Sequence, residues 1–374
     1  MSERKLHIVH TESSCGWGGQ EIRILSEARG MLARGHQVTL VTPPEARIAA
    51  VAREMGLPLL TLPIARKRLP GLLALWRWLA TAGAGIDVLN THSSTDSWLT
   101  AAACSLLRNA PPIVRTRHVS SPVGDRVSTR WLYQSAAAHV VVTGEALRQQ
   151  LHRDNGFALA SMTSVPTGID LSRFVRLDPM ARAGHASALG MPDAPYVGIL
   201  ATLRNWKGHA YLFDAFAQLA DEFEAWQLLV VGDGPQRNNL VRRAQELGLS
   251  HRIHFVGNRD DPERWLQLMD LFVLPSYGDE GVPQSIMQAM ACGLPVISTP
   301  VGAIAEAVDA DRTGLLVAPK SVSELVVALR RLMADDSLRA AFASAGWEKA
   351  QRQFGVDIML DRMEAIFRTH ARHG

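Results

Sequence analysis

The sequence predicts an α/β fold with two domains, each built on a parallel sheet. Short apolar runs of strand length alternate along the chain with longer stretches of helical period, which is the pattern of strands joined by helical crossovers. Runs such as "LLVV", residues 228–231, are apolar at consecutive positions, as expected of parallel strands covered on both faces. A chain of 374 residues also exceeds the size that one hydrophobic core usually organises, which favours two domains.

Eleven apolar runs are expected to be strands, because each has strand length and is bounded by polar or turn residues. Those assigned to the first domain are residues 6–10, 37–42, 87–92, 112–118 and 139–144. Those assigned to the second domain are residues 196–202, 226–234, 253–257, 271–276, 295–300 and 314–319.

The domain boundary is expected between these two sets of strands. Residues 1–170 form the predicted first domain, 171–195 the linker region and 196–356 the second domain, because residues 166–196 hold four prolines and no sustained period. Residues 357–374 have helical period and end the chain without adding a strand. Two such domains imply a cleft in which ligands bind at the carboxyl ends of the strands, so functional residues should follow strands directly.

The composition is that of a soluble globular protein, with 47% apolar and 20% charged residues. Residues 1–170 carry 18 Lys and Arg against 12 Asp and Glu, an excess of six positive charges, whereas the remainder has 21 against 24. This asymmetry suits an anionic partner. A nucleic acid is not expected, because no basic run is interleaved with stacking aromatic residues.

The N-terminus and the cysteines favour a cytoplasmic protein. The apolar run in "MSERKLHIVH" is too short for the hydrophobic region of a signal peptide, and no window of about 18 uncharged apolar residues suggests a membrane span. Cys15, Cys104 and Cys292 are odd in number and far apart, so they indicate neither a disulfide framework nor a metal knuckle.

Gly18 and Gly19 lie between a predicted strand and an amphipathic helix. Glycines there let backbone N–H groups and the helix dipole approach an anion, although a tight turn without a ligand explains them equally well. The dinucleotide fingerprint G-x-G-x-x-G cannot be laid over residues 16–21, and in residues 232–237 Arg237 stands at the third glycine position.

Arg204 and Lys207 lie in the turn after the first strand of the second domain. Two cations on such a loop can neutralise a diphosphate, and each charged hydrogen bond contributes roughly 1.5–3 kcal/mol. A solvated basic turn is the alternative.

His92 and His118 each end a predicted strand. Without nearby acids they are poor metal ligands, and His118 is expected to hydrogen-bond a ligand or to be structural. Residues 309–311, "DAD", match a D-x-D pattern that metal-dependent sugar transfer uses, but their position between a helix and a strand predicts a turn. No metal is expected.

Glu280 follows one predicted strand and precedes an apolar helix, so it is expected at the crevice end of the sheet. Gly281 and Pro283 shape the entry to that helix, since Pro fits a first turn. Gln288 follows eight positions later, which predicts that both side chains point to one face. Alternatively, Glu280 only complements the helix dipole.

Taken together and in order, the motifs resemble those of family 4 glycosyltransferases with the GT-B fold, over nearly the whole chain. The matching segments are "GWGGQE", "LARGHQVTLVT", "NTHSS", "PTGIDLSRF", "LRNWKGH", "VVGDGPQRNNL", "RIHFVGN", "DLFVLPS", "EGVPQSIMQAMACGLPVIST" and "TGLLV". The resemblance implies two Rossmann-like domains, an acceptor held by the first and a nucleotide-sugar held mainly by the second. It also implies that the last helix crosses back to the first domain, and that anomeric configuration is retained without a metal.

The resemblance assigns roles to individual residues. Glu280 matches the first acid of the family's E-x7-E motif, which holds hydroxyls of the donor sugar. The backbone of Gly281 and Val282, beside Pro283, then faces the sugar and diphosphate, and Lys207 matches the phosphate lysine. In this interpretation the nucleoside diphosphate departs while positive charge grows on the anomeric carbon, and Lys207 and the helix N-terminus stabilise the leaving group.

Further residues match the remaining parts of the donor. His118 matches the histidine beside the C6 end of the sugar, and Arg259 and Asp261 fall where the base is held. Two departures stand out: Gln288 replaces the second acid of E-x7-E, and Thr202 stands at the position of the family's phosphate arginine. An amide oxygen still accepts hydrogen bonds from ribose, and Arg204 is the candidate substitute for the missing arginine.

These features predict a retaining hexosyl- or other glycosyltransferase that uses a UDP- or GDP-sugar and builds a cell-envelope polysaccharide or glycolipid, such as lipopolysaccharide, capsule or exopolysaccharide. The alternatives are a nucleotide-sugar epimerase of the same fold and a non-catalytic subunit that binds a sugar nucleotide, which Thr202 and Gln288 would favour.

Residues 65–83 predict contact with an anionic membrane on its cytoplasmic face, where a lipid-linked acceptor would lie. The segment joins three basic residues to an apolar run with two tryptophans and an arginine (Arg66, Lys67, Arg68, Trp76, Arg77 and Trp78). An ordinary core-facing helix is the alternative.

Overall fold

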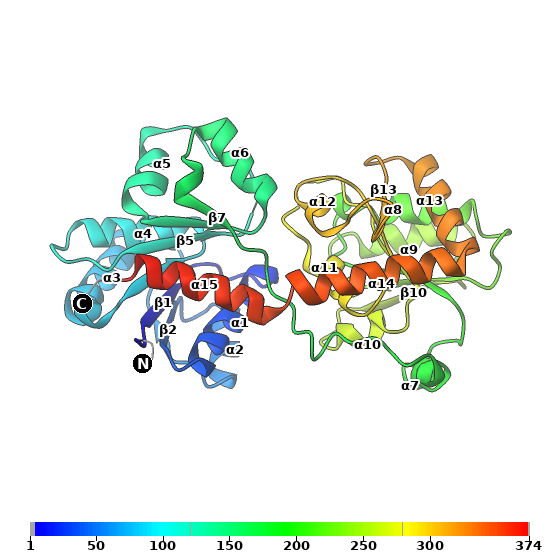
Figure 1. The fold of residues 1–374 in the computed structure, drawn as a ribbon, viewed down its shortest axis with the longest axis horizontal. Coiled ribbons are helices and arrows are strands. Elements are labelled where there is room, and N and C mark those ends of the chain that lie inside the picture. The colour runs from blue at the N-terminus through cyan, green and yellow to red at the C-terminus, as the bar shows by residue number, and fades with distance from the viewer. Residues whose placement is uncertain (1–3, 120, 279, 373–374) are drawn as a thin grey trace. The chain divides into compact units, whose positions relative to one another are not determined.

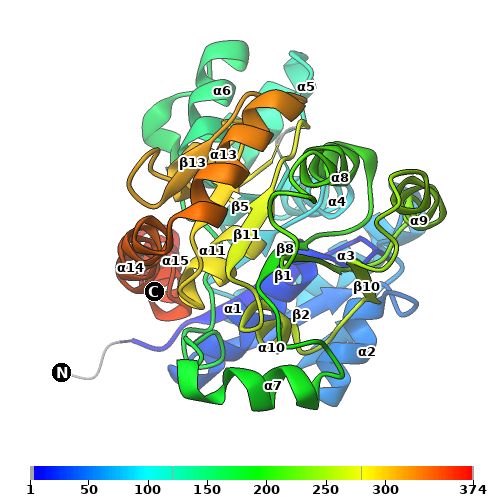
Figure 2. The same cartoon turned by 90° about the vertical axis from the view of Figure 1, so that its right-hand side faces the viewer.

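The computed structural model describes residues 4–119, 121–278 and 280–372, which divide into two compact units. The first unit comprises Met1–Gly168 and Val356–Gly374, and the second comprises Ile169–Gly355. Figures 1 and 2 show a twisted sheet flanked by helices in each unit.

The first unit contains a seven-stranded parallel sheet in the order β3-β2-β1-β4-β5-β6-β7. The strand order reverses between β1 and β4, which is where ligands bind in open sheets of this type. The strands are β1 (His7–Thr11), β2 (Gln37–Thr42), β3 (Leu59–Thr61), β4 (Val88–Thr91), β5 (Ile113–Arg117), β6 (His139–Val142) and β7 (Met162–Ser164).

Helices cover both faces of this sheet. They are α1 (Gly19–Ala33), α2 (Arg47–Glu54), α3 (Leu69–Ala82), α4 (Ser94–Ser105), α5 (Val127–Trp131), α6 (Glu145–Asn155) and α15 (Val356–His370), with short helices η1 (Gly83–Gly85), η2 (Leu132–Ala136) and η3 (Leu159–Ser161). Side chains of α1, α2 and α15 form one core cluster, and those of α3, α4, η2 and α6 form the other.

Alternate strand residues explain the two clusters. Ile8 belongs to the first cluster and its neighbour Val9 to the second, because successive side chains of a strand point to opposite faces. The last helix joins this unit through its apolar stripe: Met359, Leu360 and Met363 are buried with residues of α1 in the first cluster, and Figure 1 shows α15 alongside α1.

The second unit contains a six-stranded parallel sheet in the order β10-β9-β8-β11-β12-β13, with its reversal between β8 and β11. The strands are β8 (Tyr196–Leu200), β9 (Gln227–Val231), β10 (Ile253–Gly257), β11 (Leu271–Leu274), β12 (Val296–Ser298) and β13 (Gly314–Leu316). The α/β class and the parallel sheets predicted from the sequence are thus confirmed.

Helices again lie on both faces, with α8, α9 and α13 on one side and α10, α11 and α14 on the other (Figure 2). They are α7 (Arg182–Ala188), α8 (His209–Ala217), α9 (Arg237–Glu246), α10 (Pro262–Leu266), α11 (Gln284–Ala291), α12 (Ile304–Ala307), α13 (Val322–Ala334) and α14 (Asp336–Gln353), with η4 (Pro179–Ala181) and η5 (Asn205–Lys207).

All eleven expected runs contain strands, and two further strands occur, β3 and β7. Each of these has only three residues and lies at an edge of the first sheet, so neither shows the apolar pattern of a covered strand. Residues 171–195, expected as a linker region, lie within the second unit and include α7.

Candidate functional site

The side chains of Lys207 and Glu280 meet beside the central strands of the second sheet. Lys207 ends η5 in the loop after β8, and Glu280 lies in the loop after β11, the neighbouring strand. The Lys207 Nζ donates to Glu280 Oε1 at 2.5 Å, and the Ser276 hydroxyl donates to the same oxygen at 2.8 Å. The two charged side chains are only 19% and 12% exposed, so they form a mostly buried ion pair at the reversal of strand order.

Two glycines allow these loops to approach so closely. Gly208 has φ +79°, and a Cβ there would lie 2.1 Å from the Pro275 carbonyl oxygen. Gly302 has φ +58°, and a Cβ there would lie 2.0 Å from the Glu280 carbonyl oxygen, to which the Ala303 N–H donates at 2.9 Å. Both positions therefore need a residue without a side chain, and both fix the backbone around the ion pair.

Arg204 lies in the same loop as Lys207, but its guanidinium does not join the ion pair. Its Cζ lies 5.0 Å from the centroid of the Trp206 ring. Arg204 lines a separate cavity of about 240 Å³ together with His209 and residues of α9. To take over the phosphate contact of the family's arginine, the Arg204 side chain would have to move away from Trp206.

Arg259 and Asp261 lie together in the loop after β10, two strands away from β8. The Cζ of Arg259 lies 4.8 Å from the Trp265 ring centroid, and Asp261 Oδ1 accepts a hydrogen bond from Trp265 Nε1 at 3.2 Å. Neighbouring strands are about 4.8 Å apart, so two strand spacings give roughly 10 Å between this loop and the loop of Lys207. A nucleotide laid along the sheet edge would span such a distance.

The structure places Glu280 before helix α11, as expected, but it does not support the shared face expected of Glu280 and Gln288. Helix α11 begins at Gln284 and Pro283 is its N-cap, so Glu280 lies outside the helix. The helical spacing of Glu280 and Gln288 therefore does not put them on one face, because only Gln288 follows the helical period. Val282 is buried at 7% exposure, whereas Gly281 and Gln288 are partly exposed.

In the first unit, Gly18 and Gly19 mark the start of α1, as expected. Gly18 is the N-cap with φ −177°, which any residue can adopt, and a Cβ there would meet only Glu21 at an ordinary 3.8 Å. The backbone geometry at Gly18 therefore does not require glycine. Any anion site at the start of this 15-residue helix would therefore rest on the helix dipole rather than on a backbone that only glycine can adopt.

His118 is the end of a chain of three histidines. His118 Nε2 lies 2.9 Å from His92 Nδ1, and His92 Nε2 lies 3.0 Å from His10 Nδ1. Burial is the main reason why the pKa of each ring lies below its usual range, and the pKa of His10 falls to about 3. A neutral ring has one N–H, so both hydrogen bonds must point the same way along the chain, and the tautomer of His10 sets that of His118.

Two buried acids in the first unit were missed in the sequence. Burial raises the pKa of Glu12 to about 8, with repulsion from Asp96 as the second cause, and burial raises the pKa of Asp96 to about 6. Asp96 caps α4 by accepting from the backbone N–H of His92 and Ser93. The sequence contains a signal for Asp96, because "STDS", residues 94–97, is a polar capping pattern directly after a strand.

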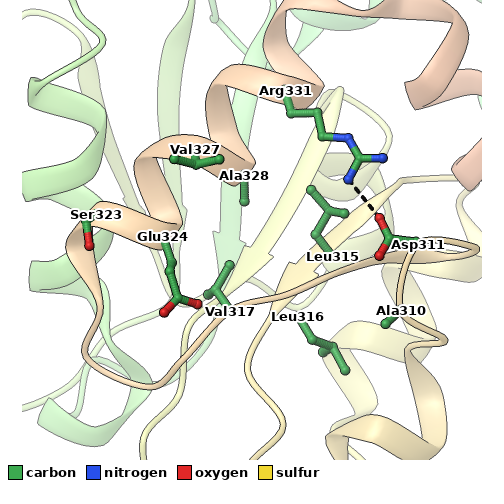
Figure 3. Close-up of a pocket in the computed structure, with 10 residues that line it drawn as sticks. All are labelled: Ala310, Asp311, Leu315, Leu316, Val317, Ser323, Glu324, Val327, Ala328 and Arg331. Atoms are coloured by element: carbon green, nitrogen blue, oxygen red, sulfur yellow. Dashed lines mark hydrogen bonds and ion pairs between the residues drawn. The ribbon is translucent and has the colours of Figure 1, made fainter.

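The D-x-D segment is a turn, as predicted. Asp311 has φ +56° and is paired with Arg331 at 2.7 Å, and Asp309 is paired with Lys349 at 2.7 Å. Figure 3 shows the Asp311–Arg331 pair beside a hollow of about 390 Å³ between β13 and α13, whose lining includes none of the candidate site residues. Nowhere in the described part of the chain do three or more His, Cys, Asp or Glu side chains gather so that they could hold a metal ion.

Comparison with known proteins places this geometry in a family. Residues 17–173 match the family model described as Glycosyltransferase Family 4, and residues 194–335 match the model described as Glycosyl transferases group 1. A D-inositol 3-phosphate glycosyltransferase of Corynebacterium jeikeium is 30% identical over 69% of this chain and 67% of its own length. The chain therefore belongs to glycosyltransferase family 4.

Other relatives are named for different acceptors. The 2-deoxystreptamine glucosyltransferase of Streptomyces kanamyceticus is 28% identical over 79% of this chain and 83% of its own length. The lipopolysaccharide core biosynthesis mannosyltransferase LpsB of Rhizobium meliloti is 32% identical, over 56% of this chain and 61% of its own length. The crystal structure of Anabaena HepE in complex with UDP has a TM-score of 0.85 at 21% identity and covers 98% of this chain and 100% of its own, which establishes the GT-B fold.

Within residues 4–119, 121–278 and 280–372, none of the helices has the length and apolar character that crossing a membrane requires.

Proposed function

We propose that the protein is a retaining glycosyltransferase that moves a sugar from a UDP- or GDP-sugar to a glycan or lipid-linked acceptor of a cell-envelope polysaccharide. The observation that carries the proposal is the Lys207–Glu280 pair at 2.5 Å, placed where the strand order of the second sheet reverses. A cation for a diphosphate and an acceptor for sugar hydroxyls are the two groups that a sugar nucleotide needs at its reacting centre.

In the structure the positive charge of Lys207 and the negative charge of Glu280 are paired with each other. A bound donor would break this ion pair. Its diphosphate would then become the partner of Lys207, and its sugar hydroxyls would become the partners of Glu280. The exchange keeps both charges paired, which matters because a mostly buried charge without a partner is costly. The Ser276 hydroxyl, which also donates to Glu280, holds the carboxylate in place during the exchange.

The rest of the donor fits the remaining residues. The N-terminus of α11, preceded by Gly281, Val282 and Pro283, would direct the positive end of its helix dipole toward the diphosphate. Arg259 and Asp261 would hold the base at the β10 loop, and Gln288 would accept from the ribose. The chemistry is departure of the nucleoside diphosphate, stabilised by Lys207, while charge develops on the anomeric carbon.

Relatives support the donor and acceptor classes by name. The HepE structure contains UDP, and LpsB is a lipopolysaccharide core mannosyltransferase. These names favour a nucleoside diphosphate-sugar donor and an envelope glycan as acceptor. We also propose that the transfer takes place in the cytoplasm or on the cytoplasmic face of the membrane. We further propose that transfer needs no metal, since Lys207 and the start of α11 supply the positive charge that a metal would bring.

The test is transfer of radiolabel from a panel of UDP- and GDP-sugars to envelope glycans and glycolipids, in excess EDTA and with added magnesium or manganese. We expect equal transfer in all three conditions and an α-to-α or β-to-β outcome by NMR of the product. Interconversion of the sugar nucleotide without an acceptor would instead identify an epimerase. Binding without any turnover would identify a silent subunit, and strict dependence on a metal would contradict the role given to Lys207.

A further inference from the structure

The first unit contains a polar cavity of about 420 Å³ that none of the donor assignments except His118 uses. It opens where β5 ends and is lined by the start of α4, the end of β5, residues after His118, and η2. Among its described lining residues are two arginines, Arg115 and Arg117, and no acid.

Both arginines are buried cations that lack an acidic partner. Arg115 is 3% exposed and Arg117 is 8% exposed, and neither forms an ion pair among the described residues. The Nε and Nη1 of Arg115 and the Nε of Arg117 have no hydrogen-bond partner. Arg117 is held by Tyr133, whose hydroxyl accepts from Nη1 at 3.0 Å, and the Arg115 Cζ lies 4.6 Å from the centre of the same ring. Buried charges are normally paired, so an anion bound between these two arginines would stabilise them.

The acids nearby do not supply that anion. Asp96 attracts Arg115 at longer range, but its oxygens accept from the hydroxyls of Thr11 at 2.9 Å and Ser13 at 3.0 Å and from two backbone N–H groups. Burial raises the pKa of Glu12 to about 8, so this carboxyl is largely neutral at pH 7. The positive charge of the arginine pair therefore remains available to a ligand.

The start of α4 adds an aromatic surface to the lining of the cavity, and Lys67 contacts two of the lining residues there. Ser94 begins the 12-residue helix α4, and its hydroxyl accepts from Lys67 Nζ at 3.3 Å. That Nζ also lies 5.5 Å from the centre of the Trp98 ring, which lines the cavity. An oxyanion would find cations here, and the carbon skeleton that carries it would find an aromatic face.

We propose that this cavity binds the acceptor and that the acceptor is a sugar or polyol carrying a phosphate group, which Arg115 and Arg117 hold. A phosphate accepts hydrogen bonds in several directions, and two guanidinium groups on alternate residues of one strand approach it from one face. The inference rests on the proposed function, because only a transferase needs an acceptor, and His118, assigned to the donor sugar, lines the same cavity.

The experiment measures binding of glucose 6-phosphate, inorganic phosphate, glucose and glucuronate to the full chain by calorimetry, with UDP or GDP present to fill the donor site. The variants are Arg115→Gln, Arg115→Lys and Arg117→Gln, with Arg53→Gln on the exposed face of α2 as the matched control. We expect glucose 6-phosphate to bind and glucose not to, and each Gln variant to weaken binding about 10- to 100-fold, the value of one charged hydrogen bond. Arg53→Gln should bind as the parent does.

Other outcomes are separable. If Lys207→Met abolishes phosphate binding while Arg115→Gln and Arg117→Gln keep it, the phosphate uses the donor site and the inference is wrong. Preference for glucuronate over glucose 6-phosphate would overturn the phosphate assignment. Arg115→Lys keeps the buried charge and, with circular dichroism, shows whether a loss in Arg115→Gln is only unfolding. If no nucleotide binds but glucose 6-phosphate still binds through Arg115, the proposed function fails and the ligand is not shown to be an acceptor, while the phosphate-binding site at the arginine pair stands.

Discussion

At the residue scale, the pairing of Glu280 with Lys207 makes the two charges interdependent. Removing the carboxylate would leave the mostly buried Lys207 without its ionic partner and the Ser276 hydroxyl without its acceptor. It would also remove the charged group proposed to bind the hydroxyls of the donor sugar. The cost should fall on the reacting complex, where the aligned charge is desolvated. The two partners should therefore be tested by kinetics as well as by stability.

We expect Glu280→Gln to lower kcat on the order of 10²–10³-fold, the usual effect of losing one aligned group in a desolvated site. Steady-state kinetics on the best donor, with circular dichroism to check folding, would measure it. Ser276→Ala removes only the hydroxyl that donates to Glu280, so we expect it to lower kcat less than Glu280→Gln does. Retention of most of the kcat by Glu280→Gln would mean that the carboxylate serves only the ion pair and the helix dipole.

Gln288 should behave differently, because the ribose that it is assigned to hold does not react. Gln288→Glu restores the acid that the family usually has at this position and should act on donor binding alone. A uniform binding change alters KM and leaves kcat nearly constant, so we expect a KM shift of less than about tenfold. A large change of kcat in this variant would show that α11 positions the reacting sugar through Gln288.

Glu12 gives the first unit a distinctive response to pH. Its pKa is raised from 4.5 to about 8, mainly by burial, so the folded state holds a proton that the unfolded chain has lost. This stabilisation is complete below the unfolded pKa and disappears as the pH rises through about 8. Relative to Glu12→Gln, the parent should lose about 3 kcal/mol of unfolding free energy between pH 6 and pH 9.

Urea unfolding of both proteins across that range would measure the difference, and Glu45→Gln, at an exposed position of the same unit, controls for removal of an acid. A constant difference between parent and Glu12→Gln would show that Glu12 is ionised in the fold.

At the scale of elements, the strands were predictable and the polar surroundings of the site were not. Eleven strands follow from apolar runs, because burial on both faces leaves a continuous signal. The apolar pattern of β5 predicted no role for Arg115 and Arg117, although two arginines at alternate positions of a covered strand share a face. The apolar pattern cannot show that a cavity receives them. Nor can it show that the helix after Glu280 begins only at Gln284, which removes the face that Glu280 and Gln288 were expected to share.

The helix α3 is the element to which the membrane proposal belongs. Its buried side is formed by Gly71, Leu75 and Leu79, whereas Leu69 is 64% exposed next to the exposed basic residues Arg66, Lys67 and Arg68. Trp76 and Trp78 pack against the core of the first unit. The start of the helix is therefore the part that we expect to contact a membrane surface. We expect sedimentation with anionic vesicles and none with neutral ones.

Changing Arg66, Lys67 and Arg68 together to Ser should abolish that binding. The matched control changes three other exposed arginines of the same unit, Arg29, Arg53 and Arg108, to Ser. Equal loss in both triple variants would indicate attraction to net charge rather than a docking segment, and no binding by the parent would end the membrane proposal.

At the scale of the whole molecule, the two units differ in charge and in the parts of the reaction proposed for them. Residues 1–170 have six more positive than negative charges, and the buried arginine pair lies among them. The second unit holds the Lys207–Glu280 pair and the loop with Arg259 and Asp261. A donor should therefore act first on the second unit, which hydrogen exchange can resolve.

We expect a saturating nucleotide-sugar to slow amide exchange in residues 201–208, 258–261 and 280–284, because these loops hold the proposed diphosphate, base and sugar contacts. At 100 times its dissociation constant the ligand should add about 2.7 kcal/mol to the unfolding free energy of the unit that binds it. The apparent melting temperature of a chain with two units is not a single equilibrium, so the exchange pattern, not the shift alone, decides the matter. Lys207→Met should remove protection at residues 201–208 while leaving that at 258–261, since the base loop keeps its own contacts. Protection confined to residues of the first unit would contradict the assignment of the donor to the second sheet.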